Sequence, residues 1–430
     1  MNPRLDSSEN SSAAWRFYEA ERQRYLPRNY WANVVEGGLY MAGAAFVAGE
    51  TVLPAMVKSL GGPNWLIAMT PILVIFGFSL PPLIMAHLVE RLTWMKPYVM
   101  IVTIFQRIPY LIAGLALVIW GPSHPEVALP FVILAPLLSG LGAGLAIPAW
   151  FEMVCRVIPQ ERMASSWALR FLIQGIGGLL AGGVIAFVLD RYPGPRGFGI
   201  LMLITFAFLV LSFFVLALMK EVRPPVRDDP GSHETLIESW RSRWRIWKEN
   251  LLMRRFLYAR MLAFAYLLPA PYLGLQALAD TGKPESFLGT LVIVQMIGGI
   301  SANAGSALMG DRLGARWLLL ASRMTLMIVC IGLWLADGVV GWIGIFFFYG
   351  FSFATQNVGF SSMLAQLCPP GKRPTFMALQ SLVSLPCLLG AALVAGIIMD
   401  HLGGMMTIAT VTFVFQASAG YFLLQMPKGK

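Results

Sequence analysis

Ala307-Leu-Met-Gly-Asp311-Arg312-Leu-Gly314-Ala-Arg316 forms a short basic turn between two long apolar segments of the chain. An acidic residue, an arginine and a glycine follow one another closely, so that the turn between the two segments is only a few residues long. Each segment is long enough to cross a bilayer, which takes about 20 apolar residues. The turn therefore indicates a protein with membrane-spanning helices joined by tight charged loops.

The same kind of turn occurs earlier in the chain. An earlier pair of apolar segments is joined by Ala86-His-Leu-Val-Glu90-Arg91-Leu-Thr93-Trp-Met-Lys96, which is a weaker copy of the turn from Ala307 to Arg316. A charged turn repeated inside a membrane protein indicates that the chain consists of two related halves. Membrane proteins built from internal repeats are often carriers.

Composition supports a membrane protein that crosses the bilayer many times. The chain has 430 residues, of which 57% are hydrophobic and 13% charged, and its mean hydropathy is +0.67. A soluble protein needs more polar surface than this. The apolar runs predict twelve spans near 32–58, 64–89, 97–120, 127–150, 165–190, 198–219, 256–280, 286–309, 317–336, 341–366, 375–400 and 405–426.

The net charge of +10 is explained by membrane topology and not by nucleic-acid binding. If the N-terminus is cytoplasmic, most of the 32 lysines and arginines fall in the tails and inner loops. This asymmetry is the positive-inside pattern, so both termini are expected in the cytoplasm. The expected location is a plasma membrane or a bacterial inner membrane. The predicted outer loops carry only Lys58, Arg191, Arg196 and Lys283.

The two halves also align at a fixed distance along the sequence. Pro159 and Pro369 are 210 positions apart (369 − 159), and the same offset pairs Gly140 with Gly350 and Asp190 with Asp400. We therefore predict an all-α membrane protein of two six-helix bundles. The expected parts are a cytoplasmic tail at 1–29, one bundle at 30–220, a cytoplasmic linker with an interfacial amphipathic helix at 221–255, and a second bundle with a short tail at 256–430.

These features together resemble the major facilitator superfamily of transporters, over essentially the whole chain. The inner-loop motif of that family, a small residue followed by Asp-Arg, a variable residue, Gly and basic residues, matches from Ala307 to Arg316. The resemblance implies the fold of that family, with two bundles related by a pseudo-two-fold axis. It also implies that spans 1, 4, 7 and 10 line a central cavity.

The chain departs from the family pattern at three places. In the first-half turn, Glu90 replaces the aspartate and Thr93 the glycine. The fourth span has the glycines of the family motif, Gly140 and Gly142, but lacks the arginine that is linked to proton coupling in many members. The fifth span lacks the Gly-Pro signature of antiporters. Ordinary proton-coupled chemistry therefore cannot be carried over to this chain from the resemblance.

Polar residues in predicted spans are the candidates for solute binding, because polar groups at membrane depth are costly and often functional. The tenth span is the richest in them. One stripe of it, at helical spacing, carries Tyr349, Ser352, Gln356 and Phe360, and amide and hydroxyl groups beside aromatic rings suit a neutral or zwitterionic solute. The other reading of this stripe is hydrogen bonding between helices. The candidate substrate-binding residues are Tyr349, Ser352, Gln356, Asn357, Gln276 and Tyr40.

The charged residues of the predicted spans that are candidates for ion coupling or buried pairing are Glu50, Arg107, Glu36 and Arg323. Glu36 lies closer to the inner face, as do Arg170 and Arg260, and these three are the weaker candidates. Glu50 lies deep in the first span and Arg107 deep in the third. A lone charge at that depth costs several kcal/mol, so we predict that Glu50 and Arg107 pair. If Glu50 is unpaired instead, it becomes the leading protonation site.

The charged turns are expected to close the cytoplasmic side. We predict that Arg91 pairs with Glu152 at the inner end of the fourth span. In the second half the position equivalent to Glu152 is Ser362, so the two gates are expected to differ. The candidate gating residues are Glu90, Arg91, Glu152, Asp311, Arg312, Gly314 and Arg316.

The sequence favours a secondary active transporter of a small organic solute over other classes. Its four histidines are isolated, and it has no phosphate-cradling glycine loop or catalytic triad order, so no enzymatic activity, metal or cofactor is predicted. The expected partners are a small-molecule solute, the lipid bilayer, and a coupling proton or sodium ion, with no nucleic acid, and the protein is expected to act as a monomer. An exporter of amphiphilic compounds and a non-transporting receptor or sensor are the alternatives.

Overall fold

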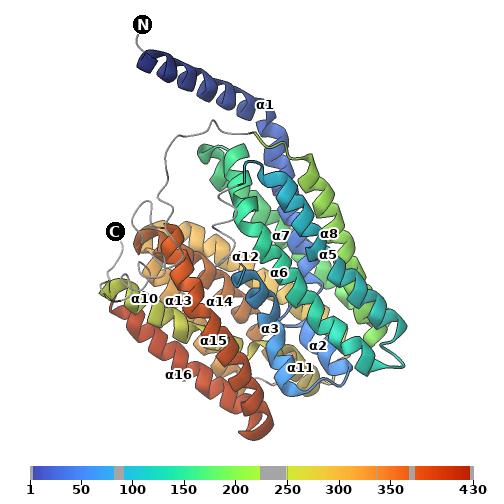
Figure 1. The fold of residues 1–430 in the computed structure, drawn as a ribbon. Helices are drawn as coiled ribbons and strands as arrows, with labels where there is room; N and C mark the ends of the chain where they lie inside the picture. Colours follow the sequence, from blue (N-terminus) through green and yellow to red (C-terminus); the bar gives the residue numbers. More distant parts are fainter. Residues whose placement is uncertain are drawn as a thin grey trace.

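The computed structural model describes residues 3–81, 92–222, 248, 250–335, 337–367 and 373–426. All regular secondary structure in these residues is helical. The helices gather into two bundles, one from each half of the chain (Figure 1). We call the side on which α1 begins and α16 ends the termini side, and the opposite side the far side.

The first half begins with a helix that is longer than a membrane span. Helix α1 is 43 residues long and includes almost all of the predicted polar tail. Its first turns project beyond the bundle (Figure 1). The helices of this half are α1 (Pro3–Ala45), α2 (Val52–Ser59), α3 (Asn64–Ser79), α5 (Met95–Ile119), α6 (Pro125–Val157), α7 (Gln160–Arg191) and α8 (Pro195–Leu218).

The second half repeats this order of elements. Its first span is also interrupted, by the short 3₁₀ helix η1. The elements are α10 (Leu251–Ala263), η1 (Phe264–Leu267), α11 (Ala270–Thr281), α12 (Phe287–Leu313), α13 (Ala315–Leu335), α14 (Gly338–Leu367), α15 (Arg373–His401) and α16 (Gly404–Leu424).

The packing order within each half is the same. In the first half α6 packs on α3 and α5, and α8 packs on α1 and α5. In the second half α14 packs on α12 and α13, and α16 packs on α10 and α13. The most extensive contacts across the halves are those of α7 with α12 and of α3 with α15, which are equivalent pairs in the two repeats; α11 also meets α2 and α3. The two halves are therefore related as the sequence repeat predicts.

Two glycines explain why the repeat was visible at Gly140 and Gly350. A Cβ added to Gly140 would lie 2.5 Å from the carbonyl oxygen of Val74 on α3. A Cβ added to Gly350 would lie 2.0 Å from the carbonyl oxygen of Gln295 on α12. Both glycines let two backbones touch, which is the usual role of small residues between membrane helices.

Ten helices of the described residues are long and apolar enough to cross a membrane. They coincide with the third to twelfth predicted spans. The first two predicted spans correspond to α1 with α2 and to α3, an apolar helix of 16 residues. The structure confirms an all-helical protein of membrane type, whereas the count of twelve spans stays a prediction. The linker predicted at 221–255, with its amphipathic helix, lies mostly outside the described residues.

Candidate functional site

The first span of each half is broken near its middle, and the two breaks lie at equivalent positions. Residues 46–51 separate α1 from α2, while η1 and two further residues separate α10 from α11. Pro269 ends the second break and Pro271 lies in the first turn of α11, and proline removes a helix hydrogen bond. Broken helices at matching positions in two repeats often hold the binding site of a transporter.

Glu50 lies in the first break and reaches the second half of the molecule. Its carboxylate accepts a hydrogen bond from the side-chain amide of Gln295 on α12 (Nε2 to Oε2, 3.1 Å). The hydroxyl of Tyr349 on α14 lies close to the same carboxylate and is buried with no other partner. No lysine or arginine of the described residues forms an ion pair with Glu50. Glu50 is therefore a carboxylate between the halves that only neutral groups contact.

The prediction that Glu50 pairs with Arg107 is wrong for this structure. Arg107 donates from Nε to the carbonyl of Leu209 (2.6 Å) and from a terminal nitrogen to the carbonyl of Thr103 (2.5 Å). Its guanidinium also lies 5.1 Å from the ring centre of Phe213. Backbone carbonyls and an aromatic face thus satisfy the arginine, and it needs no carboxylate.

Glu36 forms a buried ion pair that was not predicted from the sequence. Its carboxylate lies 2.9 Å from a terminal nitrogen of Arg170 on α7, and both side chains are buried. Arg170 also packs 4.8 Å from the ring centre of Trp150. This pair ties α1 to α7 within the first half.

Arg323 is the most deeply buried charge of the second half. Its exposed fraction is 1%, and it donates to the side-chain oxygens of Gln356 and Gln416, the latter at 2.6 Å. Ser352 exchanges hydrogen bonds with Ser322, the residue before Arg323. Ser352 and Gln356 of the predicted substrate stripe are therefore bonded to α13, which agrees with the alternative that this stripe serves hydrogen bonding between helices.

The remaining predicted substrate residues are dispersed. Tyr40 accepts a hydrogen bond from Gln106 Nε2 (2.7 Å) on α5. Gln276 donates to Asp280 one turn along α11 (2.8 Å) and is near the far side. Asn357 is exposed. Of the six candidates, Tyr349 alone has a buried polar group without a hydrogen bond.

Arg260, a weaker candidate from the sequence, and Tyr266, which was not selected from it, lie beside this group. Arg260, on α10, stacks its guanidinium 4.1 Å from the ring centre of Phe360 and 5.0 Å from that of Phe264. Tyr266, in the second break, is buried and lies within electrostatic range of Glu50, Arg260 and Arg323. The breaks therefore bring one carboxylate, two arginines and two tyrosines into one region.

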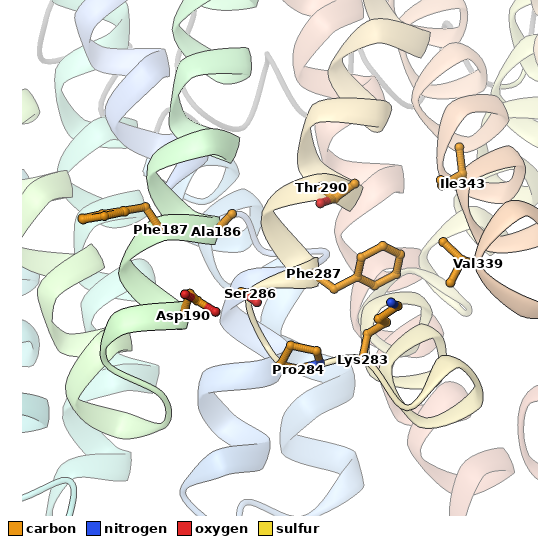
Figure 2. A pocket seen from close by; sticks show the side chains of 10 residues that line it. All are labelled: Ala186, Phe187, Asp190, Lys283, Pro284, Ser286, Phe287, Thr290, Val339 and Ile343. Atoms are coloured by element: carbon orange, nitrogen blue, oxygen red, sulfur yellow. The ribbon is translucent and has the colours of Figure 1, made fainter.

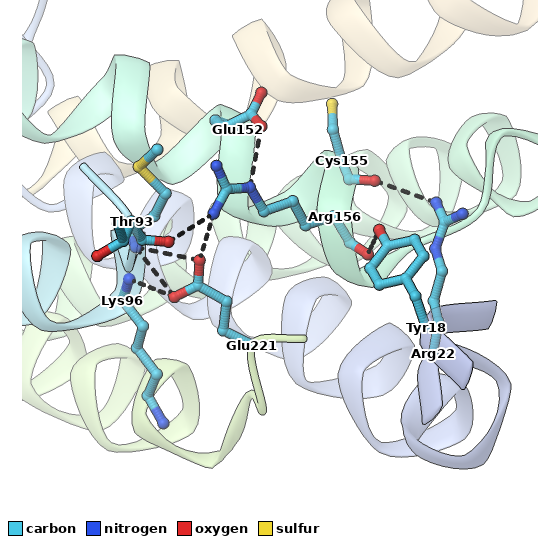
Figure 3. A network of polar contacts seen from close by, with 9 residues as sticks. Tyr18, Arg22, Thr93, Lys96, Glu152, Cys155, Arg156 and Glu221 are labelled. Atoms are coloured by element: carbon cyan, nitrogen blue, oxygen red, sulfur yellow. Dashed lines mark hydrogen bonds and ion pairs between the residues drawn. The ribbon is translucent and has the colours of Figure 1, made fainter. Parts of the chain in front are cut away.

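A separate polar network ties the helix ends of the first half on the termini side (Figure 3). Glu221 accepts hydrogen bonds from the backbone amides of Met95 (3.0 Å) and Lys96 (2.8 Å), at the start of α5. Its carboxylate also lies 3.1 Å from Arg156 at the end of α6. Arg156 pairs in turn with Glu152 (3.0 Å).

Part of the N-terminal tail joins this network. Tyr18 donates its hydroxyl to the carbonyl of Arg156 (2.9 Å), and Arg22 donates to the carbonyls of Cys155 and Ile158. Burial raises the pKa of the Tyr18 hydroxyl above its ordinary value. These bonds show that α1 packs against the end of α6 before it enters the bundle.

The predicted gating residues lie on the termini side where the structure describes them. Glu90 and Arg91 lie outside the described residues, as do the side chains of Asp311 and Arg312, so the predicted pair of Arg91 with Glu152 stays a prediction. Gly314 has a positive φ of 81°, which explains the glycine of the turn. Arg316 donates to the carbonyl of Met426 (2.7 Å) and so fixes the end of α16.

A groove of about 590 Å³ opens on the far side where α7 meets α12 (Figure 2). Asp190 and Lys283 lie on its rim, and the aromatic rings of Phe187 and Phe287 contribute to its wall. Its charged residues are exposed. The groove is thus a feature of the surface seam between the halves, apart from the buried group around Glu50.

Comparison with solved structures shows the same fold in several transporters. A mutant form of the nucleoside transporter NupG is 13% identical, with 92% of this chain and 98% of that chain covered and a TM-score of 0.69. The D-xylose-proton symporter is also 13% identical, with coverage of 94% and 98% and a TM-score of 0.68. A bacterial homologue of the iron transporter ferroportin in an inward-facing state is 18% identical, with coverage of 93% and 98% and a TM-score of 0.64.

Among curated proteins, no sequence matches this chain. A family model gives the sequence-level assignment. The model described as Major Facilitator Superfamily matches residues 107–384. This segment begins in α5 and ends in α15, so it includes parts of both halves. With the repeated bundles and the shared fold, it follows that the chain belongs to the major facilitator superfamily and is a multi-pass membrane solute transporter.

Proposed function

We propose that the protein is a secondary active transporter that carries a small organic solute across a cell membrane by alternating access. The observation that supports this best is the pair of matched helix breaks, which place Glu50 and Tyr266 between the two halves. In transporters built from repeats, the halves move around a site near the middle of the membrane. A binding group between the halves is what such a movement requires.

The contacts between the halves support a conformation that is closed on the far side. Asn64 at the start of α3 donates to Asp400 at the end of α15 (2.6 Å) and accepts at its carbonyl from Tyr272 (2.8 Å). Glu285 accepts from the backbone amide of Gly194 (2.9 Å). A further link between the halves is the bond of Gln295 with Glu50. With the termini in the cytoplasm, as the charge asymmetry predicts, this conformation is inward-facing.

Glu50 is our proposed coupling residue, with a proton as the coupling ion. A carboxylate that neutral groups hold at the interface can load a proton from one side and release it to the other. The groups of the described residues that face it are Gln295 and Tyr349, with Tyr266 in electrostatic range. None of them carries a fixed positive charge that would keep Glu50 ionised throughout the cycle.

The charged turns are our proposed gate on the termini side. Glu152 is half exposed and lies beside Arg156, so it is available to a second arginine. We assign that role to Arg91, which closes the termini side when the halves approach there. The equivalent turn at Asp311 and Arg312 serves the second half with other partners, because Ser362 replaces the acid.

Solute flux in proteoliposomes tests this function. The purified protein in sealed vesicles is expected to accumulate a solute from a labelled metabolite mixture when an inward proton gradient is imposed, and vesicles with Glu50→Gln protein are expected to lose the gradient dependence. Accumulation that follows a sodium gradient instead would replace the proton as coupling ion. A protein that binds a solute in detergent but shows neither flux nor exchange in vesicles would indicate a receptor.

A further inference from the structure

In the second half, the charged residues well inside the predicted spans are arginines, and the acidic residues lie at or near the ends of helices. Between residues 256 and 426 the acids stand at or near the ends of helices, and none lies near the middle of a predicted span. Arg260 and Arg323 therefore have no carboxylate of their own half at their depth. The acids of this half are Asp280, Glu285, Asp311, Asp337 and Asp400.

Arg323 is stabilised by neutral groups, whereas Arg260 is not. The amide oxygens of Gln356 and Gln416 and the hydroxyl of Ser322 accept hydrogen bonds from Arg323. Arg260 has no hydrogen bond or ion pair with any described residue. The Nε atoms of both arginines are buried without a partner, but both terminal nitrogens of Arg323 donate hydrogen bonds and those of Arg260 do not. A cation that is largely removed from water and has no acceptor in the protein is stabilised by an anion, so Arg260 is an open anion-binding group.

The position of Arg260 makes it reachable by a solute. It lies about 14 Å from the start of α10, at 1.5 Å per residue, and its side chain is partly exposed. The rings of Phe264 and Phe360 both pack against the guanidinium, which orients it without neutralising it. Arg323 lies 6.0 Å from the centre of the same Phe360 ring, so the region carries two positive charges.

The buried arginines of the first half, unlike Arg260, have hydrogen-bond acceptors within the protein. Arg170 has a buried carboxylate partner in Glu36, and Arg107 donates to two backbone carbonyls. Both are satisfied within the protein. Arg260 stands apart from these two because it has aromatic contacts only.

We propose that Arg260 binds the carboxylate group of the transported solute, and that the substrate is therefore an organic carboxylate. This rests on the proposed transport function. The guanidinium offers two parallel N–H donors that match a carboxylate, and the second charge at Arg323 adds to the attraction. Tyr266 lies within electrostatic range of both Glu50 and Arg260, so the proposed anion site and the coupling carboxylate belong to the same region.

Stability without any solute provides the first test. If Arg260 awaits a ligand, the variant Arg260→Met is expected to unfold at the same temperature as the wild type or a higher one, because an uncompensated charge is removed. Arg170→Met is the matched control and is expected to lower the unfolding temperature by several degrees, since it leaves Glu36 buried and unpaired. A similar loss in both variants would overturn the proposal and make Arg260 a structural residue.

Binding provides the second test, with benzoate, succinate and N-acetylglycine as probes and their uncharged amides as matched controls. At least one carboxylate is expected to raise the unfolding temperature of the wild type while its amide does not. Its affinity is expected to fall at least tenfold in Arg260→Gln and less in Arg260→Lys, and to stay unchanged in Arg254→Gln on the same helix. No preference for any carboxylate over its amide would overturn the proposal.

Flux separates this proposal from the transport function on which it rests. A carboxylate that binds through Arg260 but does not cross proteoliposomes contradicts transport and leaves the anion site standing. Flux of an uncharged solute that Arg260→Met does not change contradicts the anion site and leaves transport standing.

Discussion

Asn64 and Asp400 join the two halves of the molecule through a hydrogen bond of 2.6 Å from the amide Nδ2 to the carboxylate Oδ1. The bond connects the start of α3 to the end of α15 on the far side. Next to it, a Cβ added to Gly396 of α15 would lie 2.9 Å from the backbone of Trp65. A polar bond and a close backbone contact thus close the far side at the same place.

Asp400→Ala is expected to open the far side more often. The bond is lost while the backbone contact at Gly396 is kept. The variant is therefore expected to stay folded and to populate the state that is open on the far side more often. Spin labels at Ser123 and Leu402, on exposed far-side loops of the two halves, should report a larger fraction of long distances. Asp280→Ala is the control, because Asp280 bonds within its own helix. An unchanged distance distribution would show that the bond does not hold this state.

Gly350→Ala is expected to destabilise the second half by about 1–3 kcal/mol, the usual effect of overpacking. The added Cβ would lie 2.0 Å from the carbonyl oxygen of Gln295, and this backbone atom cannot move aside as a side chain can. Gly344→Ala on the same helix is the control, since a Cβ there meets nothing within 4 Å. Thermal unfolding in detergent should show a lower midpoint for the first variant and no decrease for the second.

The sequence was sufficient for the fold because hydrophobic length and repetition are local properties. The offset between Gly140 and Gly350 identified two halves, and both glycines prove to be backbone contacts between equivalent helices. The inner turn at Gly314 likewise has the positive φ that selects glycine.

The candidate site was only partly accessible from the sequence, since rotation of a helix about its axis is set by packing. Gln356 and Ser352 lie on one stripe of α14, but that stripe faces α13 and Arg323. Arg107 finds backbone carbonyls that no sequence pattern marks. Pro269 and Pro271 could have predicted the break that holds Tyr266, because proline interrupts a helix. A break in one repeat then suggests a break at the equivalent position of the other.

Glu221→Ala is expected to destabilise the first half by about 3–5 kcal/mol, as the loss of one partner of a buried ion pair does. The Glu221 side chain is 2% exposed, and it both pairs with Arg156 and accepts the first amides of α5. Glu152 pairs with the same arginine but is 49% exposed, so Glu152→Ala should cost less than about 1 kcal/mol. Equal effects of the two variants on the unfolding midpoint would contradict the structural role of Glu221.

Glu50→Gln is expected to keep the fold and remove the response of transport to pH. Glutamine has nearly the shape of a protonated glutamic acid and can still accept a hydrogen bond from Gln295, so stability should change little. A side chain that cannot release a proton cannot couple flux to a proton gradient, and exchange of solute without a gradient should persist. The measurement is solute uptake against exchange in proteoliposomes over a range of pH. Gln295→Ala is the informative comparison, because it removes the hydrogen bond but keeps the carboxylate. If Gln295→Ala stays pH-dependent while Glu50→Gln does not, the carboxylate itself carries the proton. If both variants retain gradient-driven uptake, coupling lies elsewhere and Glu50 serves only to join α12 to the first half.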